Sequence, residues 1–166
     1  MVQLSFSQET YKRPFFTTSL ATTLTINENY TLDPDDGEPF LIPNSIILRM
    51  GVGYQLHRRI LLSVHTGFDH HWGYDITAIP GYGTLRYNIT ENDGAAFFVE
   101  TSYGKLWRPT KRFSDGNYSG IGIGFELEST SNRSSSFRLK YHRKSILNFE
   151  NNRLDSFSIG FGLSFF

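Results

Sequence analysis

Two adjacent histidines lie beside acidic residues near the middle of the chain. His70 and His71 follow Asp69, and Asp75 comes shortly after them. Neutral imidazoles and carboxylates are ligands that suit zinc or copper. Adjacent residues of an extended chain point to opposite sides, however, so the two imidazoles would not chelate one ion together. We therefore expect a polar loop here, with no metal and no cofactor.

Ionisable residues also recur at every second position of several segments, with apolar residues between them. Arg138, Lys140 and His142, for example, alternate with Phe137 and Leu139. A β-strand turns successive side chains to opposite faces, so such a segment has one charged face and one apolar face. The ionisable residues that this pattern places on polar faces are Arg49, His65, Arg86, Glu100, Glu126, Glu128, Arg138, Lys140 and His142.

The elements that carry these residues are predicted to be β-strands. Helical periodicity is nearly absent, and β-rich runs of about ten residues recur between turn residues. The predicted strands cover Phe15–Ile26, Ser45–Leu56, Arg59–Phe68, Ile76–Ile89, Ala95–Leu106, Tyr118–Glu128, Ser136–Ile146 and Ser156–Phe166. Pro80 lacks a backbone donor, so we expect it at a bulge, a strand end or an unpaired position.

The composition excludes several classes of protein. The 166 residues include 16 basic and 16 acidic residues, so no positive charge excess favours nucleic-acid binding. Cysteine is absent, which excludes disulfides and thiolate chemistry. No run approaches the roughly 18 apolar residues of a membrane-spanning helix, and the mean hydropathy is -0.33. The length predicts one domain over residues 1–166.

The last predicted strand indicates which face meets which environment. Phe157, Phe161 and Phe165 share one parity, and the opposite parity carries serine and glycine up to the final Phe166. A strand of a membrane barrel turns its apolar face to lipid and its polar face to a packed interior. The glycine-rich polar face and the aromatic ending favour this orientation. The opposite orientation would give a soluble, lipocalin-like barrel with a ligand cavity.

The predicted connections alternate between short and long. The long ones cover residues 27–44, 69–75, 107–117 and 147–154. Outer-membrane barrels have short periplasmic turns, longer extracellular loops and an even number of strands. We therefore predict an all-β, eight-stranded antiparallel up-and-down transmembrane β-barrel in a bacterial outer membrane. Its signal peptide is expected to have been removed.

An eight-stranded barrel holds little more than its own side chains. We therefore expect the ionisable residues of the polar faces to pair inside the barrel, with glycines making room for them, instead of lining an open channel. The run of alternating glycines from Gly120 to Gly124 lies inside a predicted strand. It is not a phosphate-binding loop, because no helix follows it.

One of the long loops is basic, and its cations are Lys105, Arg108, Lys111 and Arg112. Two interpretations are equally open. The loop could pair with the acidic residues of the first long loop at the same rim. Alternatively, together with Arg143 and Lys144, it could contact lipopolysaccharide phosphates or a partner protein, since arginine binds phosphate through two donors and lysine as a point charge.

The predicted strand number, the loop alternation and the ending GFGLSFF resemble the small eight-stranded outer-membrane β-barrel proteins of Gram-negative bacteria. The segment YHRKSILNFENNRLDS also resembles the lipid A deacylase barrels, whose late strand carries a His-x-Ser-Asn element and a later acidic residue. This second resemblance implies His142, Ser145 and Asp155 as catalytic residues. Lys144 interrupts the element, and a bulge would be needed to bring Ser145 within hydrogen-bond reach of His142.

Three functions therefore remain open. The leading expectation is a non-enzymatic cell-envelope protein, integral to the outer membrane, whose loops serve surface interaction or dock onto an envelope complex. Its expected partners are outer-membrane lipid, lipopolysaccharide and another envelope protein, and not nucleic acid. The alternatives are a lipid A deacylase-like hydrolase and a soluble lipocalin-like binding barrel. A fold alone cannot choose among such functions.

Overall fold

The computed structural model describes residues 13–26, 41–92, 94–109, 115–130, 132–147 and 152–166, almost all of them in β-strands. The strands are β1 (Arg13–Ile26), β2 (Leu41–Pro43), β3 (Ser45–His57), β4 (Ile60–His71), β5 (Ile76–Asn92), β6 (Ala95–Trp107), β7 (Gly116–Thr130), β8 (Arg133–Ile146) and β9 (Arg153–Phe165). The short 3-10 helix η1 (Trp72–Tyr74) follows β4. Among the described residues no helix is both long enough and apolar enough to cross a membrane.

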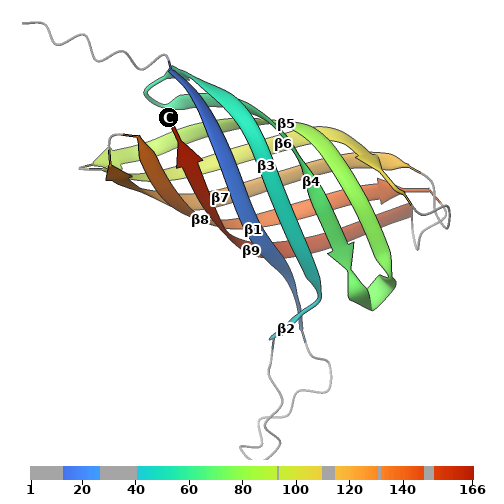
Figure 1. Ribbon diagram of the computed structural model, residues 1–166. Helices are drawn as coiled ribbons and strands as arrows, with labels where there is room; N and C mark the ends of the chain where they lie inside the picture. Colours follow the sequence, from blue (N-terminus) through green and yellow to red (C-terminus); the bar gives the residue numbers. More distant parts are fainter. Residues whose placement is uncertain (1–12, 27–40, 93, 110–114, 131, 148–151) are drawn as a thin grey trace, which may run out of the picture.

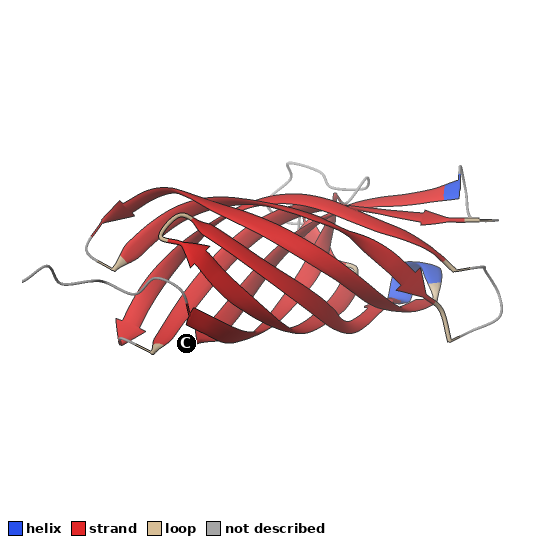
Figure 2. Cartoon of the chain, turned by 90° about the horizontal axis from the view of Figure 1, so that it is seen from above, coloured by secondary structure: helices blue, strands red, loops and turns tan. Residues whose placement is uncertain are grey.

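The eight long strands form a closed antiparallel barrel (Figure 1). Each long strand pairs with the next one along the chain, and β1 also pairs with β9, which closes the sheet. The short strand β2 extends the pairing of β1 beyond the barrel. The view from above shows the strands wrapping around one elongated barrel (Figure 2). The predicted eight-stranded up-and-down architecture is confirmed.

The strands are tilted because their registers are offset around the barrel. A path along paired residues leaves β1 at Thr23, crosses every long strand and returns to β1 at Arg13, ten residues earlier. It passes through Ser158, Lys140, Gly122, Glu100, Arg86, Leu61 and Gln55. Such an offset corresponds to a tilt of roughly 35–45° in a barrel of this size. Residues on this path are therefore neighbours inside the barrel, although they lie far apart in sequence.

Short and long connections lie at opposite ends of the barrel. The short-turn end carries the turns β3–β4, β5–β6 and β7–β8. The long-connection end carries the links β1–β3, β4–β5, β6–β7 and β8–β9. The predicted long loops fall at the second end, but residues 27–40, 110–114 and 148–151 of those loops lie outside the described residues.

The predicted loop at residues 69–75 is mostly incorrect. Strand β4 continues through Asp69 and His71, which pair with Ala78 and Ile76 of β5. Both side chains are buried and continue the inward parity of His65. The link between β4 and β5 is therefore little more than η1.

Pro80 lies where the pairing of β4 and β5 is interrupted. The ladder pairs Thr66 with Gly81 and resumes only at Asp69 and Ala78. Proline has no amide hydrogen to donate, so an interruption of this kind accommodates it. Pro80 is thus unpaired toward β4, as its chemistry predicted, while on its other side it pairs with Leu106 of β6.

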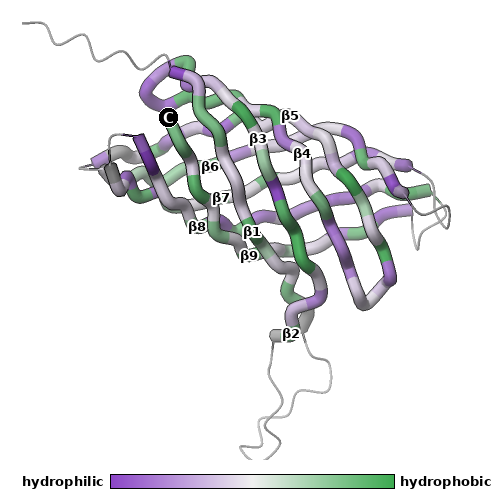
Figure 3. Tube along the Cα trace, in the orientation of Figure 1, coloured by the Kyte–Doolittle hydropathy of each residue, from purple (hydrophilic) through white to green (hydrophobic). Residues whose placement is uncertain are grey.

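The two faces of the sheet differ in polarity as a membrane barrel requires, with the apolar face outside and the polar face inside. On β3 the outward residues Ile46, Leu48, Met50 and Val52 are exposed, whereas Arg49 between them is buried. Hydrophobic and hydrophilic residues alternate in the same way along the other strands (Figure 3). The lipocalin-like alternative needed the apolar parity inside, so the structure contradicts it.

The outward apolar belt generates a test of this orientation. Val52 lies near the middle of β3 and is 56% exposed, whereas Leu56 lies on the same face near the short-turn end. Val52→Arg should lower the free energy of unfolding from lipid vesicles by roughly 2–4 kcal/mol, because it places a charge in hydrocarbon. Leu56→Arg should cost at most about 1 kcal/mol, since arginine there reaches the interface. Equal, small effects of both substitutions on urea unfolding would contradict the lipid-facing assignment.

Candidate functional site

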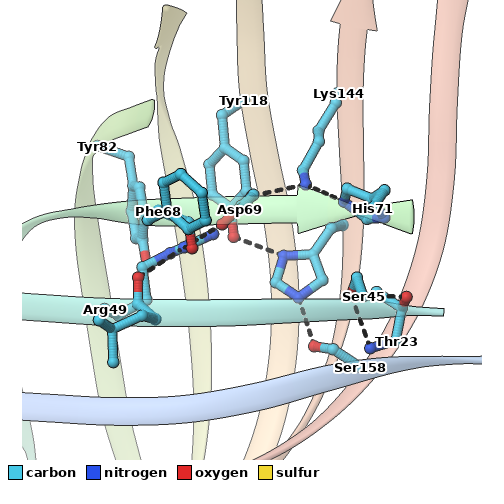
Figure 4. Close-up of polar contacts among 12 residues, drawn as sticks. Thr23, Ser45, Arg49, Phe68, Asp69, His71, Tyr82, Tyr118, Lys144 and Ser158 are labelled. Atoms are coloured by element: carbon cyan, nitrogen blue, oxygen red, sulfur yellow. Dashed lines mark hydrogen bonds and ion pairs between the residues drawn. The ribbon is translucent and has the colours of Figure 1, made fainter. Parts of the chain in front are cut away.

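The polar interior of the barrel is the candidate site, because most of the described ionisable groups that are buried gather there. Its first centre is the Asp69 carboxylate near the long-connection end (Figure 4). Asp69 forms ion pairs with both Arg49 and Lys144, the latter at 2.6 Å. All three side chains are at most 6% exposed. One carboxylate from β4 thus joins β3 to β8 across the interior.

The Lys144 ammonium also reaches His71, whose Nε2 accepts its hydrogen bond at 2.6 Å. His71 is buried, whereas the neighbouring His70 points outward and lies 3.0 Å from the Thr77 hydroxyl. The two imidazoles face opposite sides of the sheet, as adjacent strand residues must. Within the described part of the chain, no group of three or more potential ligands is arranged to hold a metal ion.

His142 lies beside this centre and is held through both ring nitrogens. Its Nδ1 lies 2.5 Å from the Tyr118 hydroxyl, and its Nε2 contacts the Ser158 hydroxyl. Ser158 itself donates to the Lys140 carbonyl. One ring nitrogen of a neutral imidazole donates and the other accepts, so Tyr118 and Ser158 together satisfy both nitrogens of His142. All three side chains are buried in the barrel interior.

Aromatic rings cross the interior next to this centre. Tyr82 and Tyr118 stack with their centroids 4.5 Å apart, and Arg49 donates to the Tyr82 hydroxyl at 3.1 Å. His65 stacks on the other side of Tyr82 at 5.2 Å. These rings pack against one another in the interior of the barrel.

A second ion pair joins β6 to β8 across β7. The Lys140 ammonium contacts the Glu100 carboxylate at 2.7 Å and donates to Ser102 at 2.8 Å. Gly122 is the register partner of both Glu100 and Lys140. A Cβ at Gly122 would lie only 3.2 Å from Lys140 Cγ and 3.4 Å from Glu100 Cγ. The glycine therefore provides the space through which the two long side chains meet.

The third centre lies toward the short-turn end. Arg86 forms an ion pair with Glu126 and donates to Asn88 at 3.0 Å. Its guanidinium also covers the ring of Phe98, at 3.7 Å from the centroid. Phe98 takes the inward position that the alternation assigned to a polar residue, and Gly124 makes room for its ring. A cation–π contact makes this aromatic residue compatible with a charged interior.

Two small cavities lie among the described residues of the interior. A cavity of about 40 Å³ lies between Tyr82, Arg138 and His142, and another of about 20 Å³ lies near His65 and Phe166. Cavities of these sizes hold about one to three water molecules. Chemically, the arrangement can pair charges and hold water, but these cavities are too small for a sugar or an acyl chain.

The structure places most of the predicted polar-face residues inside the barrel. Buried side chains are Arg49, Arg86, Glu100, Glu126, Lys140 and His142, and half-buried ones are His65 and Arg138. Glu128 is a correction, because its side chain is exposed. It lies near the end of β7, where the strand reaches the rim of the barrel and inward parity no longer means burial.

The suggested catalytic residues are not brought together. His142 points into the barrel, whereas Ser145 and Asp155 are exposed on the outer face. Strand β8 has no bulge between His142 and Ser145, as its continuous pairing with β9 shows. Asp155 instead binds Arg143 at 2.8 Å. The deacylase-like arrangement is therefore absent from this geometry.

The suggested phosphate-binding cations are divided between the two faces. Lys105 and Arg143 are exposed on the outer face, as expected. Arg108 and Lys144 are buried, which corrects their assignment to a surface contact. Lys111 and Arg112 lie outside the described residues.

Known structures share this architecture. Neither a protein-family model nor a curated protein matches the chain in sequence. The crystal structure of Neisserial surface protein A (NspA) is similar with a TM-score of 0.66 and 10% identity, over 92% of this chain and 96% of that one. The chain has the fold of a small transmembrane β-barrel. A de novo designed transmembrane β-barrel is also similar, with a TM-score of 0.50 and 10% identity over 95% and 97% of the two chains. The resemblance to small outer-membrane barrels is thus confirmed for the fold.

Several interior residues were missed in the sequence. Asp69 and His71 were assigned to a loop, and Tyr82 and Tyr118 were not included among the polar-face residues. The missing signal was parity, since Asp69 and His71 continue the alternation that begins at Leu61. Tyrosine is ambiguous, because its ring suits lipid and its hydroxyl suits a polar interior.

The Asp69 centre gives a test of the interior network. Asp69→Asn removes the negative charge that Arg49 and Lys144 share, and should lower the free energy of unfolding by roughly 3–5 kcal/mol, because it leaves buried cations uncompensated. Asp155→Asn is the matched control, since Asp155 pairs with Arg143 on the outer face. Exposed ion pairs contribute little, so the control should lose far less stability in urea unfolding. Similar losses for both variants would refute the central role of Asp69.

Proposed function

We propose that this chain is an integral outer-membrane β-barrel of a Gram-negative-type bacterium, that it has no enzymatic activity, and that it presents its long connections at the cell surface. The observation that carries the proposal is the inversion of its faces, with exposed aliphatic rows outside and paired charges inside. Water would favour the opposite arrangement, whereas hydrocarbon favours this one. The similarity in fold to a surface protein supports the proposal.

The packing inside the barrel supports a surface role over a transport role. Tyr82 and Tyr118 stack beside the Asp69 centre, and the cavities near them among the described residues hold only a few waters. Segments between strands are where the function of a rigid barrel can vary, because they tolerate change without loss of the fold. The long connections are therefore the parts of this molecule proposed to meet a partner protein.

The non-enzymatic part of the proposal follows from the polar groups themselves. His142 is enclosed by Tyr118 and Ser158, and the cavity that His142 and Ser158 line has a volume of only about 40 Å³, too small for an acyl chain. The exposed Ser145 lies on the opposite face from this imidazole. A nucleophile needs a base within reach, and this pair of residues does not provide one.

The direction of insertion can be tested in intact cells. A protease site inserted within residues 110–114, in the connection between β6 and β7, should be cleaved by protease added outside the cells. The same site inserted at residues 93–94, in the turn between β5 and β6, should be cleaved only after the outer membrane is opened, because that turn lies at the opposite end of the barrel. Insertions in such connections are usually tolerated. Cleavage at residues 93–94 alone in intact cells would contradict the proposed surface presentation.

A further inference from the structure

A row of polar residues marks the outer face of β6–β9 near the long-connection end. Lys105, Asn117, Ser145 and Arg153 are successive register partners across these four strands. Each side chain points outward, and the outward positions nearer the middle of the same strand carry aliphatic or aromatic residues. The Lys105 ammonium donates to Asn117 at 2.9 Å, on the surface. This polar row therefore interrupts the apolar outer face, beyond which only Trp107 and Leu147 are exposed apolar residues among the described residues that follow Lys105 on β6 and Ser145 on β8.

The next row on the same outer face, one step closer to the middle of the strands, adds the guanidinium of Arg143 to that of Arg153. Arg143 binds Asp155 at 2.8 Å, and Arg153 approaches the same carboxylate at 3.5 Å. We call Lys105, Arg143 and Arg153, with Asp155, the cationic patch. Its three cations and one anion give the patch itself an excess of two positive charges, and the exposed Asp115, whose carboxylate accepts from the Arg108 amide, lies two residues before Asn117.

An apolar groove lies on the outer face of β3–β6, on the β6 side of the cationic patch. It has a volume of about 580 Å³ and is shallow and widely open. Its base is Gly83, which pairs with Val64 of β4 and Tyr103 of β6. Val64 and Tyr103 are 62% and 68% exposed and form its two walls. The groove exists because Gly83 carries no side chain between these two projecting ones.

The groove approaches the cationic patch at Lys105. Lys105 is the register partner of Gly81, and Gly83 is the next outward residue of β5 toward the short-turn end. Successive residues on one face of a strand lie about 7 Å apart. The Trp107 ring lies over Gly81 between them, and the Lys105 ammonium faces Asn117 of β7, on the side of Arg143 and Arg153.

We propose that this surface binds one phosphorylated lipid, with its phosphate at the cationic patch and one acyl chain in the groove over Gly83. The proposal rests on the proposed membrane function and names its lipid partner. Arginine and lysine bind phosphate through charge-assisted hydrogen bonds, and the aliphatic walls suit an acyl chain. The occupant is a lipid A-type molecule of the outer leaflet, because the patch lies at the long-connection end.

A second copy of the chain fits this surface less well. Two copies meeting through the same face would bring their cationic patches together, and like charges in contact disfavour association. An anionic lipid neutralises the patch and fills the groove at the same time. The charge of the patch thus selects the lipid as occupant.

The test uses the full chain refolded in detergent micelles, with lipid retention measured by native mass spectrometry. The probes are diphosphorylated lipid A, dephosphorylated lipid A with the same acyl chains, and phosphatidylglycerol. The charge variant combines Lys105→Gln with Arg143→Gln, and Arg59→Gln at the short-turn end is its control. The groove variant is Gly83→Leu, where an added Cβ would meet nothing closer than the Ser63 carbonyl at 3.9 Å. Its control is Ala95→Leu, also near the short-turn end.

The wild-type chain and both controls should retain one molecule of diphosphorylated lipid A. The charge variant should lose at least about tenfold in affinity for it, because two charged contacts to phosphate are removed. The same variant should bind the dephosphorylated lipid as the wild type does. Gly83→Leu should weaken both lipid A forms by a similar factor, since it blocks the acyl chain and leaves the cations intact.

Other outcomes overturn the proposal. If the charge variant binds diphosphorylated lipid A as tightly as the wild type, the phosphate site is refuted. If phosphatidylglycerol binds as tightly as lipid A, the assignment to lipid A is refuted. A dimer that Gly83→Leu dissociates would make a second copy the occupant. A wild-type chain that stays monodisperse without detergent would instead refute the proposed membrane function, and the lipid site with it.

Discussion

The closed hydrogen-bonded ladder is the constraint on which the rest of this structure depends. Because β1 pairs with β9, no long strand keeps an open edge, and the backbone is satisfied within the barrel. Closure with a register offset of ten residues fixes the tilt and sends every second side chain inward. An inward side chain has no access to lipid and little access to water, so it must find its partner across the interior.

The composition of the interior follows from that constraint. Charged side chains pair with one another over the strands between them, as Glu100 and Lys140 do over Gly122. Asp69 serves two cations at once, which joins β3, β4 and β8 into one electrostatic unit. Buried ion pairs contribute little net stability but make one arrangement much better than its alternatives. The interior is therefore best understood as the part of the molecule that specifies its register, while the outer surface determines its surroundings.

Alternation made the fold predictable from the sequence, because parity and connection length depend only on nearby residues. Parity also identified Arg49 and Lys140 as inward residues, but it could not show that Asp69 lies against Lys144, since that contact depends on the register of several strands. Strand ends were harder to predict, and for this reason Asp69 and His71 were wrongly assigned to a loop. The groove over Gly83 was not predicted, because the sequence does not distinguish a glycine that leaves a groove on the outer face from one that makes room for side chains inside the barrel.

The orientation of the two faces can be measured directly, because the chain has no cysteine and single cysteines can be introduced for spin labelling. Labels at the exposed positions Leu48, Ile123 and Phe161, in protein inserted into lipid vesicles, report whether each site meets hydrocarbon or water. The account predicts frequent collisions with oxygen, which dissolves in lipid, and rare collisions with a water-soluble nickel complex at all three sites. Frequent collisions with the nickel complex there would contradict it.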